Sequence, residues 1–168
     1  MKKIAFSFLP ILLMACASKK DMVPIGDGKA VILSQCPERG ECKIEVLKDK
    51  SLDIKTDGTG MLYYILEDTP GKVVVRYTYD LIVPKDVEDA GYTETIIFET
   101  SKGFSSLHEA NPKDVKMLFG VQCFCLGNAG FYKINEGGIT YIDEKLSITI
   151  PKNIIDDQQI SSFIVTLK

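Results

Sequence analysis

The sequence predicts an all-β protein, an antiparallel β-sandwich or partly open barrel of about 8–10 short strands with at most one or two short helical turns. Apolar and polar residues alternate along several segments, most clearly over residues 72–83. Turn-forming residues recur between these segments roughly every ten positions. No stretch with helical periodicity exceeds about two turns, which argues against a parallel sheet with crossover helices.

Segment 72–83 is the clearest strand because its two faces differ. The valines and tyrosines at odd positions from 73 to 79 share one face, whereas Arg76, Thr78 and Asp80 share the other. Residues 61–66 are apolar on both faces, which favours a central strand or one covered by a loop. The remaining strands are expected at 30–33, 42–47, 51–55, 92–99, 116–126, 130–134, 139–142, 146–150 and 159–167.

Turn chemistry separates neighbouring strands. Residues 57–60 (DGTG) and 68–71 (DTPG) are typical of reverse turns, so we expect each to lie between two strands. The segment 101–114 interrupts the β pattern, and a short helical turn is expected near residues 104–109.

Two further connections are interpreted as β-hairpins. Residues 37–41 (PERGE) are expected to form the loop between strands 30–33 and 42–47. Residues 135–138 (NEGG) are expected to form a hairpin turn between the strands on either side.

The N-terminal segment is typical of an export signal. Lys2 and Lys3 precede an apolar run that ends at Ala15, too short for the roughly 20 apolar residues of a membrane-spanning helix. Its end, Leu13-Met14-Ala15-Cys16, resembles the lipobox of bacterial lipoproteins, which is cleaved by the type II signal peptidase. Leu13, Ala15 and Cys16 match the pattern, whereas Met14 differs from the residue types usual there.

This resemblance implies a location and a domain organisation. Residues 1–15 would be a removed signal peptide, Cys16 would carry acyl chains, and 16–29 would be a polar tether to a single β domain at 30–168. Each buried methylene of an acyl chain contributes about 0.8 kcal/mol, so two or three chains hold a protein firmly in a membrane. Ala17 is similar to the residue of lipoproteins that leave the inner membrane, which favours the outer membrane of a bacterial envelope.

The charge balance argues against a nucleic-acid partner. The chain has 20 Lys and Arg against 23 Asp and Glu, and removal of Lys2 and Lys3 with the signal leaves 18 against 23, a net charge of −5. Proteins that bind nucleic acids usually carry a basic face that neutralises phosphates.

Cys36, Cys42, Cys123 and Cys125 remain after Cys16, and an even number in an exported chain favours two disulfides. Cys123 and Cys125 would lie on one face of a strand with Cα atoms roughly 6.6–7 Å apart, at the limit for a bridge. A bond between them therefore requires a bend. We expect the 36–42 loop to be bridged to the Cys123 strand instead, although a local bond between Cys36 and Cys42 is also possible.

Other loop residues are weaker candidates. Asp86, Glu88 and Asp89 lie close together in a loop that could bind Ca²⁺ or could simply be solvated. His108, the single histidine, is expected to be an ordinary loop residue. Gly127 to Gly130 superficially resembles a phosphate loop, but a tight connection between strands is favoured. Tyr63 and Tyr64 should point to opposite faces, one toward a core and the other either exposed in an aromatic patch or packed under a loop.

These features favour a non-catalytic binding or structural module of the envelope, without a cofactor other than the lipid on Cys16. Another envelope protein, a peptide or a glycan would be its partner, and we assign no catalytic residue or metal ligand. Two alternatives stay open. One is a thiol-redox or metal-binding module that uses Cys123 and Cys125. The other is an inhibitor that presents the 36–42 loop, with Arg39 at its centre, to the cleft of a target.

Overall fold

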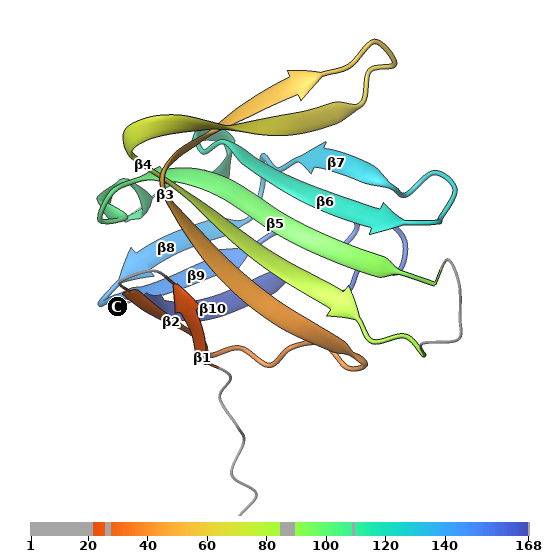
Figure 1. The fold of residues 1–168 in the computed structure, drawn as a ribbon, viewed down its shortest axis with the longest axis horizontal. Helices are drawn as coiled ribbons and strands as arrows, with labels where there is room; N and C mark the ends of the chain where they lie inside the picture. The colour runs from red at the N-terminus through yellow and green to blue at the C-terminus, as the bar shows by residue number, and fades with distance from the viewer. Residues whose placement is uncertain (1–21, 26–27, 85–89, 109, 168) are drawn as a thin grey trace, which may run out of the picture.

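Ten antiparallel strands form two five-stranded sheets in residues 22–25, 28–84, 90–108 and 110–167, which the computed structural model describes. The strands are β1 (Met22–Ile25), β2 (Gly28–Ile32), β3 (Gly40–Thr56), β4 (Leu62–Leu81), β5 (Tyr92–Ser101), β6 (Met117–Cys123), β7 (Gly130–Lys133), β8 (Gly138–Ile142), β9 (Lys145–Thr149) and β10 (Ser162–Leu167). Sheet A has the order β1-β2-β10-β9-β8 and sheet B the order β3-β4-β5-β6-β7 (Figure 1). Helical structure in these residues is limited to the 3-10 turns η1 (Ser105–Leu107) and η2 (Pro112–Asp114). The predicted all-β antiparallel fold is confirmed.

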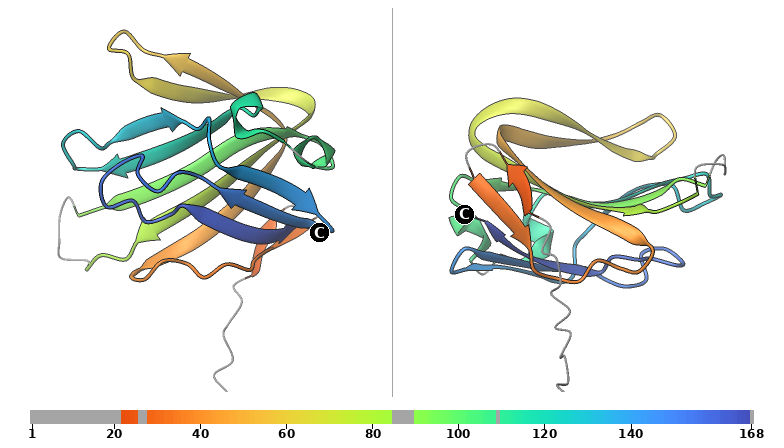
Figure 2. Two further views of the ribbon diagram at one scale, coloured as in Figure 1. Left: turned by 180° about the vertical axis from the view of Figure 1, so that it is seen from behind. Right: turned by 60° about the horizontal axis from the view of Figure 1, so that its bottom comes forward.

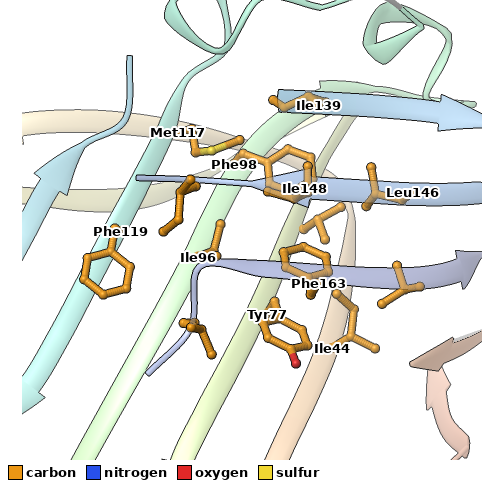
Figure 3. Packing of buried hydrophobic residues seen from close by; sticks show 14 of the residues in the cluster. Ile44, Tyr77, Ile96, Phe98, Met117, Phe119, Ile139, Leu146, Ile148 and Phe163 are labelled. Atoms are coloured by element: carbon orange, nitrogen blue, oxygen red, sulfur yellow. The ribbon is translucent and has the colours of Figure 1, made fainter. Parts of the chain in front are cut away.

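The main core lies between the two sheets. Val73, Val75, Tyr77 and Tyr79 of β4 are buried on the inner face of sheet B, as the alternation predicts. Figure 3 shows side chains from both sheets in the space between them, and the rings of Tyr77 and Phe163 stack with centroids 4.2 Å apart. Each such large apolar side chain contributes about 1.5–3 kcal/mol by leaving water.

Both predicted hairpins are wrong, because each connection crosses from one sheet to the other. β2 pairs with β1 and β10 in sheet A, whereas β3 pairs with β4 in sheet B. β7 likewise pairs with β6 in sheet B, and β8 pairs with β9 in sheet A. Turn residues such as Gly137, at φ 120°, allow a chain to change sheets as readily as to reverse within one.

The predicted turn at residues 68–71 is a bend within one long ribbon. β3 and β4 pair along almost their whole length, but Lys48 pairs with Val73 and Lys50 with Asp68, so four residues of β4 lie opposite Asp49 alone. Asp49 and Gly71 have φ of 54° and 82°, and the Asp49 carboxylate accepts a hydrogen bond from the Gly71 N–H at 2.9 Å. The mismatch in length bends the ribbon sharply without reversing the chain.

The distal half of this ribbon, residues 50–68, is called the arm below. It folds over the outer face of sheet B, away from sheet A (Figure 2). Its tip reaches β7, where Leu62 pairs with Phe131. The proximal half of β4 therefore pairs with β5, and its distal half, in the arm, contacts β7. Through this second contact, sheet B curls into a partly closed barrel beside the sandwich.

A second apolar core fills the space beneath the arm. Leu52 of the arm and Val74, Ile97 and Leu118 of sheet B are fully buried there. The partly buried residues packed against them are Leu47, Ile54, Leu62, Tyr64, Leu66 and Phe131. This packing explains why one face of residues 61–66 is apolar, whereas Met61, Tyr63 and Ile65 on the other face are exposed.

Candidate functional site

The four cysteines form two local disulfides. Cys36 bonds to Cys42 with Cα atoms 5.7 Å apart, and Cys123 bonds to Cys125 with Cα atoms 5.2 Å apart. The expected bridge between the 36–42 loop and the Cys123 strand is wrong. The reason is that β6 ends at Cys123, so the chain bends there and brings Cys125 closer than an extended strand would allow.

The two disulfide-closed loops meet at one end of the molecule and line an open cavity of about 430 Å³. Arg39 lies on its wall with φ 64°, and its carbonyl oxygen accepts a hydrogen bond from the Ile82 N–H at 2.8 Å. Phe124, between the bridged cysteines, also lines the cavity but is 87% exposed, so this wall is open to solvent. The structure thus brings Arg39 and the Cys123–Cys125 bond together.

A buried carboxylate stabilises this end of the molecule. Glu94 is fully buried and accepts hydrogen bonds from the Tyr92 hydroxyl at 2.5 Å and from the N–H groups of Gln159 and Ile160, each at 2.7 Å. Burial, and then the hydrogen bond to Glu94, raise the pKa of Tyr92 far above its usual value, so its hydroxyl stays a proton donor. Glu94 thus joins sheet B to the loop before β10, which is a structural role.

The remaining sequence-based candidates do not form a site. Cys16, Asp86, Glu88 and Asp89 lie outside the described residues. His108 is exposed at the end of η1, with Nδ1 3.5 Å from the carbonyl oxygen of Tyr141. Residues 127–130 lead from β6 to β7, as expected of a connection between strands.

The better defined site is a groove of about 480 Å³ between the arm and the outer face of sheet B. We call it the outer groove. Strands β3, β4, β5 and β6 supply its floor, so its side chains project from paired backbone. Its lining residues are Lys43, Ile44, Glu45, Tyr64, Arg76, Thr78, Asp80, Thr93, Thr95, Gly120, Gln122 and Phe131.

The charged groups of the outer groove are paired. Arg76 Nε donates to Glu45 Oε2 at 2.6 Å, and Lys43 Nζ lies 3.3 Å from Asp80 Oδ2. The hydrogen bond to Glu45 is the main reason that the pKa of Arg76 is raised above its usual value. Asp80 also accepts a hydrogen bond from the Thr93 hydroxyl at 2.8 Å. Two cations and two anions therefore cancel within the groove.

Two aromatic rings form the apolar wall. Phe131 of β7 and Tyr64 of the arm meet edge to face with centroids 5.2 Å apart. The Phe131 ring lies over Gly120 of β6 so closely that a Cβ at that glycine would be 2.3 Å from the ring. Gly120 is thus required for this ring position. It lets the Phe131 ring contact the backbone of β6 directly.

The sequence indicated only fragments of this groove. Arg76, Thr78 and Asp80 formed the polar face of a predicted strand, a pattern that normally indicates contact with bulk water. The two tyrosines behaved as predicted, because Tyr64 packs beneath the arm and Tyr63 is 39% exposed on its other side. The sequence pattern did not predict the bend at Asp49. It therefore did not predict that the arm lies beside this polar face.

Comparison with known proteins assigns no relative, since no protein-family model, no curated protein and no solved structure matches the chain. In the part of the chain that is described, no helix is long and apolar enough to cross a membrane. The same residues contain no group of three or more His, Cys, Asp or Glu side chains arranged to hold a metal ion. The residues that line the outer groove offer charged groups, hydroxyls, an amide and two aromatic rings.

Proposed function

We propose that this chain is a lipid-anchored protein of the bacterial cell envelope whose β domain binds a ligand in the outer groove without chemically changing it. The observation that carries the binding role is the groove itself. It combines paired charges, hydroxyl and amide groups and an aromatic wall on a floor of paired strands. Binding sites typically combine apolar walls with a few convergent polar groups in this manner, and the mouths of barrels are frequent places for them.

The lipobox-like sequence Leu13-Met14-Ala15-Cys16 supports the anchored location. Cells that express the protein would be fed an alkyne-bearing fatty acid, and the wild type would be compared with Cys16→Ser and with the control Ser18→Ala. We expect label and membrane recovery for the wild type and the control, and neither for Cys16→Ser. Retention of the label by Cys16→Ser, or an unlabelled wild type, would contradict the anchor.

Binding can be tested inside cells by photo-crosslinking. Gln122 is exposed and lines the outer groove, so a photoreactive amino acid placed there should trap the ligand. Thr140 of β8 is exposed on sheet A and serves as the control position. We expect an adduct from position 122 that position 140 does not give. No adduct, or the same adduct from both positions, would contradict a binding site in the groove.

A further inference from the structure

We infer that the ligand of the outer groove is an uncharged carbohydrate, namely a short oligosaccharide or the end of a longer glycan. This inference rests on the proposed binding function and specifies the chemical class of the ligand. Three properties of the groove support it: its charge balance, the pairing of its backbone groups within sheet B, and its combination of hydroxyls with aromatic rings.

The charge balance disfavours an ionic ligand. Arg76 is paired with Glu45 and Lys43 with Asp80, so a phosphate or a carboxylate would have to displace a carboxylate already in place. A cationic ligand would likewise have to displace Arg76 or Lys43 from its carboxylate partner. A neutral ligand can instead add hydrogen bonds to both pairs, because Arg76 uses Nε for Glu45 and its two terminal nitrogens are not consumed by that contact.

The backbone of the floor disfavours an extended peptide. Peptides that bind to sheets usually pair with the free N–H and C=O groups of an edge strand. β4 and β5 lie inside sheet B, where each has a neighbour on both sides. β6 is likewise paired with β5 and β7. Of the floor strands only β3 has a free edge, so recognition over β4, β5 and β6 comes from side chains.

Those side chains match a sugar. Thr78 and Thr95 offer hydroxyls and Gln122 offers an amide, groups that both donate and accept hydrogen bonds, as sugar hydroxyls do. The Thr93 hydroxyl donates its proton to Asp80 and can still accept a hydrogen bond. The half-buried rings of Tyr64 and Phe131 offer an apolar surface for the C–H face of a sugar ring. The cavity of about 480 Å³ lies in the range of small-ligand sites, which fits a few sugar units.

The test is titration of the isotope-labelled protein, purified from cells in a detergent whose headgroup carries no sugar. The probes are maltotetraose, cellotetraose and chitotetraose, with tetragalacturonate as an anionic comparator. We expect at least one neutral tetrasaccharide to shift the resonances of Thr78, Thr95 and Gln122 with a Kd below about 5 mM. Tetragalacturonate should bind at least about tenfold more weakly, because its carboxylates would have to displace Glu45 from Arg76 or Asp80 from Lys43.

Two conservative variants show where the sugar binds. Thr95→Val removes one hydroxyl from the groove while keeping a β-branched side chain, and we expect it to weaken binding about fivefold to tenfold. Thr140→Val makes the same change on the exposed face of sheet A and should leave the affinity unchanged. Shifts of neutral sugars that map outside the groove, or equal effects of the two variants, would overturn the inference.

The outcomes separate this inference from the proposed function. If position 122 traps a specific partner but none of the neutral tetrasaccharides shifts the groove, the carbohydrate class is wrong and binding in the groove stands. Stronger binding of tetragalacturonate than of the neutral sugars would lead to the same conclusion. If neither crosslinking nor titration detects a ligand in the groove, both proposals are overturned.

Discussion

The side-chain carboxylate of Glu99 accepts a hydrogen bond at 2.9 Å from the backbone N–H of Leu52, although 47 positions separate these residues in the chain. Lys116 Nζ donates at 3.1 Å to the carbonyl oxygen of Leu52 and lies 3.3 Å from Glu99. Lys72 Nζ donates to the same carboxylate at 2.9 Å. Both backbone groups of Leu52, on the free side of β3, are thus bonded to sheet B, which holds the arm over the outer groove.

Replacement of Glu99 by glutamine should loosen the arm. The amide keeps an acceptor for Leu52 but loses the charge that binds Lys72 and Lys116, and we expect a loss of about 1–2 kcal/mol in the free energy of unfolding. Urea denaturation would measure the loss, and hydrogen exchange at the Leu52 N–H would show whether the arm opens locally. Glu67→Gln, at an exposed position of the arm, is the matched control and should change neither. Equal exchange at Leu52 in all three proteins would contradict this role for Glu99.

The same carboxylate should make stability depend on acidic pH. Burial alone would raise the pKa of Glu99, but the hydrogen bonds from Lys72, the Leu52 N–H and Lys116 together lower it from its ordinary value of 4.5. A carboxyl group with a lowered pKa in the folded state stabilises the fold above its unfolded pKa, and this stabilisation is lost as the pH falls through its folded pKa. We therefore expect the difference in stability between wild type and Glu99→Gln to shrink below pH 4.5. Urea denaturation from about pH 7 to about pH 3 measures it, and a constant difference would contradict the linkage.

The aromatic wall of the groove should depend on Gly120. A methyl group there would lie 2.3 Å from the Phe131 ring, so Gly120→Ala must displace the ring. We expect a loss of about 1–3 kcal/mol in stability, with changed ring resonances for Phe131 and Tyr64. Gly58→Ala, which places a methyl group in open space at the tip of the arm, should change stability by less than about 0.5 kcal/mol. Unchanged resonances in Gly120→Ala would show that the ring does not lie over the glycine.

The local disulfides should contribute unequally because they close loops of different length. The chain-entropy relation gives about 2.4 kcal/mol for the Cys36–Cys42 loop and about 1.6 kcal/mol for the shorter Cys123–Cys125 loop. The double variants Cys36→Ser/Cys42→Ser and Cys123→Ser/Cys125→Ser avoid unpaired thiols, and urea denaturation compares them. Peptide mapping without reduction tests the pairing itself. A peptide that joins Cys36 or Cys42 to Cys123 or Cys125 would contradict the structure.

The strand pattern was predictable because each strand has to bury one face. The alternation at Val73, Val75, Tyr77 and Tyr79 indicated the inner face of β4 correctly. The bend in the ribbon was not predictable from residues 68–71, because the same turn chemistry can reverse a chain or bend a pair of strands. Which of these occurs depends on Asp49, whose carboxylate accepts the hydrogen bond of the Gly71 N–H and which is distant from Gly71 in the sequence.

The outer groove was harder to predict than the fold. A polar face such as that of Arg76, Thr78 and Asp80 is the normal surface of a half-exposed strand. The arm, which supplies Tyr64 to the groove, is held in place by contacts between distant residues, such as the hydrogen bond from the Leu52 N–H to the Glu99 carboxylate. Local periodicity carries no information on such contacts. The cysteine pairing was unpredictable for the same reason. The bend after Cys123 that permits a bond to Cys125 cannot be recognised from alternating apolar and polar residues.

The most direct test of the binding site is the yield of the position-122 crosslink in cells that carry a second substitution. We expect Thr95→Val to reduce this yield about fivefold or more, whereas Thr140→Val should leave it unchanged. Protein abundance measured in the same cells normalises the comparison. A yield that is insensitive to Thr95→Val, or that falls equally in both variants, would contradict a ligand site in the outer groove.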